Sequence, residues 1–246
     1  MVMNTPLRHE PRHAAKRGFT LVELSIVLVI VGLIIAGVLK GQELLENTRM
    51  KASLSQVEAI RAAASTFIER YQALPGDYSE GNNLATNVGA DWGALCDGST
   101  DAKCDGDGVI EGTGIADETL IFWQHLSAAN MIKGVQVDNV PSTKVGIGLP
   151  AADVGGGYTV DFEENTAKTT HWITLGDGGA TPVGVVDSQM AREMDAKVDD
   201  GRPQSGSVRT STAGCTVGAL SASAVLASDT YLVATIQSQC AMVFEL

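Results

Sequence analysis

The apolar positions of this chain form one long continuous run followed by a periodic stretch. Residues 19–39, FTLVELSIVLVIVGLIIAGVL, contain a single charged residue, Glu23. A helical run of this length is enough to cross the hydrocarbon core of a bilayer. After the run, apolar residues recur every three or four positions as far as Tyr71, and Pro75-Gly76 then stops a helix. The pattern predicts one helix over 19–73, apolar all round at first and amphipathic later.

The remainder of the chain consists of short runs separated by Gly- and Asp-rich segments. Residues 116–134 and 188–201 predict two further helices. Strand-like runs lie at 143–149, 157–162, 170–175, 181–186, 230–236 and 241–246. An antiparallel sheet packed on the amphipathic half of the first helix would bury both, so the predicted class is α+β.

Charge divides the chain at the start of the apolar run. Four of the 17 basic residues but only one of the 29 acidic residues precede residue 19, which leaves 13 basic and 28 acidic residues and a formal charge of −15. A basic flank stays in the cytoplasm, which places the acidic body outside. The same balance argues against nucleic acid as a partner, because such binding needs a broad basic surface.

Glu23 separates three interpretations of the apolar run. A cleaved secretory signal would have a shorter apolar region and an A-x-A site after it. A plain membrane anchor would gain nothing from a carboxylate in hydrocarbon, which costs a few kcal/mol unless it finds a partner. The third interpretation gives Glu23 a partner.

That interpretation rests on the segment RGFTLVEL, residues 17–24, directly before the apolar residues. It resembles the cleavage and methylation motif of type IV pilins and type II secretion pseudopilins. The resemblance implies that prepilin peptidase cuts after Gly18 and that Phe19 becomes the N-methylated first residue. It also implies that Glu23 pairs with the N-terminal amine of a neighbouring subunit during assembly.

The resemblance also implies an organisation for the whole chain, the pilin fold. Residues 1–18 would be a cleaved leader, 19–41 the transmembrane and assembly helix, 42–73 its amphipathic continuation and 74–246 a globular head. Many pilins carry proline where this chain has Lys40. Lys40 and Glu43 are expected where the helix leaves the bilayer.

The segment after the helix, ALPGDY at 73–78, resembles the "LPGD" junction of a subgroup of pilin-like proteins. Blocks at 104–112, 118–134 and 196–209 resemble the same subgroup in the same order.

The acidic segment 96–112 suits calcium, which prefers hard oxygen ligands. It does not fit an EF-hand at either end, and a solvated acidic loop is the alternative. The candidate ligands are Asp101, Asp105, Asp107 and Glu111.

The four cysteines predict disulfides, because the body lies in an oxidising compartment. Cys96–Cys104 with Cys215–Cys240 is the simplest of the three possible connectivities. The second pair also resembles the disulfide-bounded C-terminal region of many pilins. Zinc would require closer spacings such as C-x₂-C, which the sequence lacks.

No motif of an enzyme is present. Asp199 and Asp200 are adjacent, but adjacent carboxylates point in different directions and do not form an acid–base pair by spacing alone.

We expect a structural subunit that polymerises from the bacterial inner membrane into an extracytoplasmic filament, either a type IV pilus or a type II secretion pseudopilus. Its partners would be itself, other pilins, the inner-membrane assembly machinery and prepilin peptidase. The alternative is an anchored or filament-tip binding protein that does not polymerise.

Overall fold

The structure is a computed structural model of the whole chain. It describes residues 19–81, 104–110, 112, 117–135, 143–165, 168–179, 183–210, 215, 230–232 and 239–246. The chain divides into two compact units, 1–45 and 46–246. We describe each unit by itself. The boundaries of the four parts expected from the sequence stay predictions.

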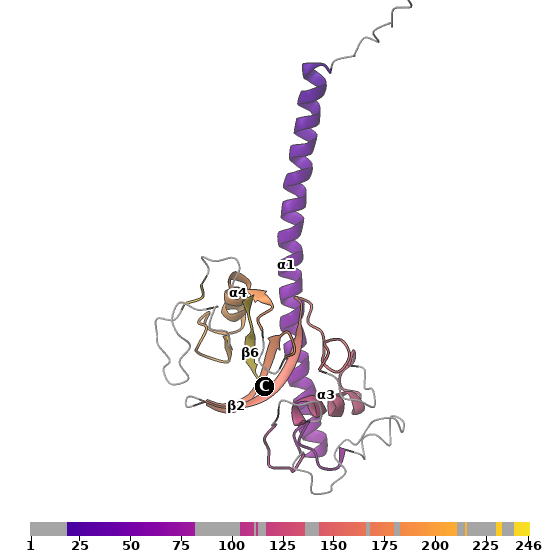
Figure 1. Cartoon of the computed structure of the whole chain (residues 1–246), viewed down its shortest axis with the longest axis vertical. Helices are drawn as coiled ribbons and strands as arrows, with labels where there is room; N and C mark the ends of the chain where they lie inside the picture. Colours follow the sequence, from indigo (N-terminus) through magenta and orange to yellow (C-terminus); the bar gives the residue numbers. More distant parts are fainter. Residues whose placement is uncertain are drawn as a thin grey trace, which may run out of the picture. The chain divides into compact units, whose positions relative to one another are not determined.

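The N-terminal helix α1 spans Leu21–Tyr71 in 51 residues (Figure 1). It ends because Gln72 adopts a positive φ of 55° and Pro75 follows shortly after. Within residues 46–71 the helix buries one stripe, and the opposite side is exposed. The buried residues are Met50, Ser53, Val57, Ile60, Ala63, Ala64 and Phe67. The predicted long helix is thus present, with its amphipathic part packed on the head.

The head is built around a four-stranded antiparallel sheet with the order β1-β2-β6-β4 (Figure 1). Its strands are β1 (Gly157–Asn165), β2 (Lys168–Gly176), β4 (Val208–Thr210) and β6 (Met242–Glu245). A two-stranded sheet pairs β3 (Val186–Asp187) with β5 (Gln239–Cys240). The remaining helices are α3 (Glu118–Ala128) and α4 (Ser188–Val198). The long helix with this sheet confirms the predicted α+β class.

One hydrophobic core joins α1, α3, α4 and the sheet. Phe67 of α1, Phe122 of α3, Ile173 of β2 and Phe244 of β6 are completely buried in it. Two polar contacts add to this packing. The hydroxyl of Tyr158 donates to the carbonyl of Ser53 at 3.0 Å, and the Nε of Arg61 donates to the carbonyl of Glu245 at 2.6 Å.

The observed strands differ from the expected ones. Residues 143–149 form a turn, because the amides of Ile147, Gly148 and Leu149 all donate to the carbonyl of Lys144. Only the isolated pairing of Val145 with Leu149 resembles a strand there. The three-residue strand β4 was not predicted, since a run that short carries no usable periodicity.

The segment before β4 covers an edge of the sheet. The carboxylate of Asp199 accepts hydrogen bonds from the amides of Ser207 and Val208, and the amide of Thr210 donates to the carbonyl of Pro203 at 2.9 Å. Asp200 instead accepts from the amide of Arg202 at 2.8 Å. The adjacent aspartates therefore bind different parts of one loop, and Asp199 also satisfies the amide of Val208 at the start of the edge strand β4.

Arg61 provides a test of how α1 is fixed to the sheet. Its guanidinium binds both Glu58, at 2.6 Å, and the carbonyl of Glu245, and only 22% of its side chain is exposed. Arg61→Met should lower the free energy of unfolding of the 46–246 fragment by about 1–3 kcal/mol, because a hydrogen bond to a charged group is lost. Urea denaturation measures this change.

The control is Arg70→Met, in which the removed guanidinium lies on an exposed part of α1 over the ring of Tyr71. That variant should lose less than about 1 kcal/mol. Equal losses in the two variants would contradict the role given to Arg61.

Candidate functional site: the start of α1 and the junction after it

The start of α1 is fixed by a reciprocal pair of side chains. The amide and hydroxyl of Thr20 donate to the carboxylate of Glu23 at 2.8 and 2.9 Å. The amide of Glu23 donates back to the Thr20 hydroxyl at 3.2 Å. This is a capping box, which satisfies two of the free donors at a helix start. Sequence reasoning missed the role of Thr20, although the pattern Thr-x-x-Glu was visible.

The capping box places Phe19 and Thr20 outside the helix, directly at the predicted cleavage position. Gly18 lies outside the described residues. Glu23 is satisfied by its own chain, yet apolar side chains surround it along the helix. Leu21 is 88% exposed and Leu24 is 52% exposed. A carboxylate in this setting is poorly suited to hydrocarbon and well suited to exchange its partner for a stronger one.

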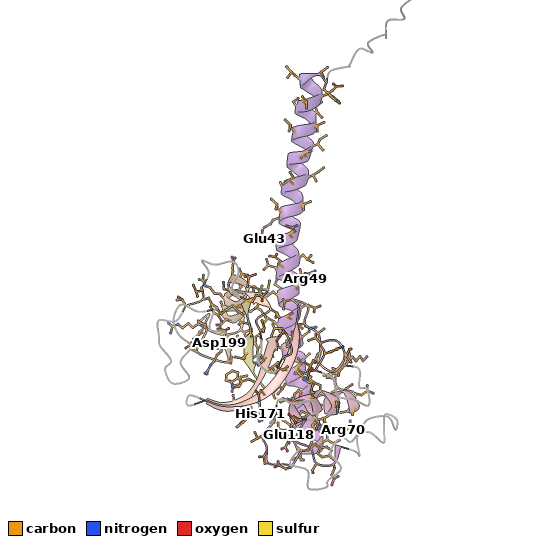
Figure 2. The ribbon with its side chains drawn as sticks, in the orientation of Figure 1. Glu43, Arg49, Arg70, Glu118, His171 and Asp199 are labelled. Atoms are coloured by element: carbon orange, nitrogen blue, oxygen red, sulfur yellow. A yellow bond between two sulfur atoms is a disulfide. The ribbon has the colours of Figure 1, made fainter. Side chains whose placement is uncertain are left out.

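No described residue of its own unit covers the apolar half of α1. Every residue from 19 to 45 is exposed, and the most apolar 18-residue window of the helix is 0% buried (Figure 2). Among the described residues, α1 is the one helix long and apolar enough to cross a membrane. The segment therefore needs an apolar surrounding from outside its own unit, such as lipid or other helices.

Comparison with known proteins agrees with this geometry. Residues 13–39 match the prokaryotic N-terminal methylation motif. The chain fits a type IV pilin-like prepilin. The motif marks a protein that is processed by prepilin peptidase, and the family to which it points is a structural one. No curated protein and no solved structure matches the chain, so the match concerns the N-terminal segment alone.

The turn after α1 connects several elements. Gly76 has a φ of 98°, and a side chain there would meet the carbonyl oxygen of Glu118 at 2.8 Å. Glycine is therefore required on both counts. The amide of Gly76 donates to Nδ1 of His125 at 2.9 Å. This contact fixes the turn to α3.

Asp77, the last residue of the LPGD junction, binds residues 104–110, which are called the acidic loop below. It is buried, and its two carboxylate oxygens accept from the amides of Gly106 and Gly108 at 2.6 and 2.7 Å. Two further acceptors bind the same loop: Glu118 binds the amide of Cys104, and Nε2 of His171 binds the amide of Ile110 at 3.1 Å. Figure 2 labels Glu118 and His171. The loop backbone is thus held by protein groups.

Of the four predicted calcium ligands, only Asp105 belongs to a group of close carboxylates, and the other two members of that group were not predicted. Oxygens of Asp77, Asp105 and Glu118 lie within 4.8 Å of one another, and Asp107 is not part of this group. Asp101 and Glu111 lie outside the described residues. Burial, with the nearby charges of Asp107 and Asp105, raises the pKa of Asp77 above its usual value. A divalent cation would relieve this repulsion, but calcium binding stays a prediction.

The calcium hypothesis can be tested at Asp105, an exposed carboxylate of this group. Calorimetry of the 46–246 fragment should detect calcium binding, and Asp105→Asn should weaken it about tenfold or more, since a charged ligand is lost. Asp153→Asn, which removes an exposed carboxylate that is not part of this group, is the control and should bind as wild type. Absence of heat at millimolar calcium would refute the site.

The cysteines of the head are oxidised in the described part of the chain. Cys215 and Cys240 form a disulfide with Cα atoms 5.4 Å apart, and both are buried. Cys104 is disulfide-bonded as well. The other member of its predicted pair, Cys96, lies outside the described residues. The Cys215–Cys240 bond anchors β5, which pairs with β3.

His125 and Asp195 are buried titratable groups of the head. Burial lowers the pKa of His125 to about 3, and its ring stacks on Phe67 with centroids 5.8 Å apart. Burial raises the pKa of Asp195 to about 6, although its carboxylate accepts from the hydroxyl of Tyr231 at 2.7 Å and from the amide of Gly201 at 3.1 Å. Each group should therefore couple stability to pH, in opposite directions.

The His125 effect should appear between pH 6.5 and 3, the interval between its usual and its lowered pKa. There the unfolded chain binds the proton that the folded head excludes, so the stabilisation present above pH 6.5 is lost as the pH falls. The slope is at most about 1.4 kcal/mol per pH unit. His125→Asn should flatten the dependence of unfolding free energy on pH in this window. Urea denaturation at several pH values measures it.

Asp195→Asn is the control with the opposite sign. The folded head holds a proton on Asp195 more tightly than the unfolded chain, so this group stabilises below about pH 4 and loses its contribution as the pH rises through about 6. Removing it should steepen the rise of stability with pH in that interval. A flatter curve in Asp195→Asn, or an unchanged one in His125→Asn, would contradict these assignments.

Proposed function

We propose that the chain is a structural subunit, a pilin or pseudopilin, that polymerises into a membrane-rooted helical filament. The processed subunit would wait in the bacterial inner membrane with residues 19–41 in the bilayer and the head outside the cytoplasm. The assembly machinery would then move it into the filament, where copies of α1 replace lipid as the apolar surrounding. The function requires no catalytic residues.

The observation that carries this proposal is Glu23 within an uncovered apolar helix. All residues around it are exposed in the isolated chain, and its side chain is held by the local capping box at Thr20. Cleavage before Phe19 would create a cationic amine in the same apolar region. Attraction between opposite charges is strong in such surroundings, so the amine of one subunit is a suitable partner for Glu23 of another.

The cysteines of the head support its placement outside the cytoplasm. Disulfide-bonded cysteines indicate an oxidising compartment, as expected for a head outside the cytoplasm. Polymerisation also explains the presence of Glu23. A membrane anchor alone would gain nothing from this carboxylate, which is costly in hydrocarbon.

Glu23→Ala tests the proposal directly. The variant should still lose its leader but should form at least about tenfold fewer filaments, because the charge that aligns incoming subunits is missing. Electron microscopy counts the filaments, and mass spectrometry of the membrane fraction follows removal of the leader. A surface filament indicates a pilus; a filament confined beneath the outer membrane indicates a pseudopilus.

The matched control is Glu69→Ala, which removes an exposed carboxylate from the head part of α1. It should assemble normally. Unchanged assembly in Glu23→Ala would refute the pairing. A processed wild type that never forms filaments would instead favour an anchored or tip-located binding protein.

A further inference from the structure

A second pair of opposite charges lies on α1 beyond Glu23. From residue 24 to residue 45 the sequence contains only two charged residues, Lys40 and Glu43. The Nζ of Lys40 lies 2.7 Å from a carboxylate oxygen of Glu43, and the two side chains are 65% and 60% exposed. Figure 2 labels Glu43 on α1.

This pair lies within the apolar surface and not beyond its end. Leu39 precedes it and is 61% exposed, while Leu44 and Leu45 follow it and are 59% and 51% exposed. Neighbouring helices that cover these leucines would also enclose Lys40 and Glu43. Two charges removed from water must remain paired, because an unpaired buried charge costs several kcal/mol.

The pair within one chain is easily exchanged. Exposed ion pairs contribute only about 0–1 kcal/mol. Lysine N-terminal to glutamate is also the less favourable order on a helix, because it opposes the helix dipole. Little stability would be lost if each side chain changed to a partner on another chain.

We propose that Lys40 of one copy pairs with Glu43 of a neighbouring copy in the filament. This inference rests on the proposed function and adds a second charge contact to it. Three residues along a helix correspond to about 4.5 Å. Two parallel copies displaced by that amount bring the lysine of one copy level with the glutamate of the other.

In both charge contacts the cation precedes the glutamate along the chain, but the two glutamates lie on different sides of α1. The amine at Phe19 precedes Glu23 by four residues, as Lys40 precedes Glu43 by three, so displacements of about 4.5–6 Å suit both. Glu23 and Glu43 are 20 residues apart in the sequence, which is about 200° around the helix. The contacts therefore address neighbours on different sides of α1.

Charge reversal in the full-length prepilin tests the proposal. Lys40→Glu and Glu43→Lys should each reduce filament number about tenfold or more when expressed alone, because like charges then face one another. Co-expression of the two variants should restore assembly to within about twofold of wild type. In the mixture, both positions are acidic on one chain and basic on the other, so every contact between unlike copies joins opposite charges.

The control is Lys51→Glu, which reverses an exposed charge in the head part of α1. It should assemble normally, because it lies beyond the apolar surface that neighbouring helices cover. Loss of filaments in this variant would mean that any charge reversal on α1 blocks assembly, and it would overturn the specific role given to Lys40 and Glu43.

The outcomes separate this proposal from the filament proposal. Rescue by co-expression supports contacts between chains. If the double exchange Lys40→Glu with Glu43→Lys assembles but the mixture does not, the pair acts within one chain and the inference is wrong. Normal assembly of both single variants also refutes it. A wild-type chain that forms no filaments refutes the proposed function itself.

Discussion

The apolar surface of α1 is the constraint on which the rest of this protein depends. Residues 19–45 expose leucine, isoleucine and valine on every side of the helix, and no described residue of their own unit covers them. Hydrocarbon or other helices must supply that cover. Each polar group in the segment is then costly unless it is paired, which gives the few charges on it unusual importance. Glu23 is paired with Thr20, and Lys40 with Glu43.

In the head, polar side chains hold the loops by hydrogen bonds to backbone amides. The junction after α1 binds other parts of the head through backbone amides. Gly76 binds His125, and Asp77 binds the acidic loop through both carboxylate oxygens. Elsewhere in the head, Asp199 protects the edge of β4. Asp77 and Asp199 thus act as acceptors for backbone amides.

The sequence was most informative where a pattern is long and local. The helix α1 follows from 51 residues that are first apolar and then periodic, and β1 and β2 follow from clear strand-like runs. The segment 143–149 was misleading because its glycines permit a turn that alternation cannot distinguish from a strand. The contacts of Asp77 with Gly106 and Gly108 join residues 29 and 31 positions apart. Such proximity is created by folding, so no spacing rule could place Asp77 and Glu118 beside Asp105.

The central claim is that copies of α1 cover one another and that Glu23 exchanges its partner in the process. The most direct measurement is a cryo-electron microscopy structure of the filament at side-chain resolution. Our account predicts that the Glu23 carboxylate lies within about 4 Å of the Phe19 amine of another copy, the distance of an ion pair. A filament in which Glu23 remains bound only to Thr20 of its own chain would contradict it.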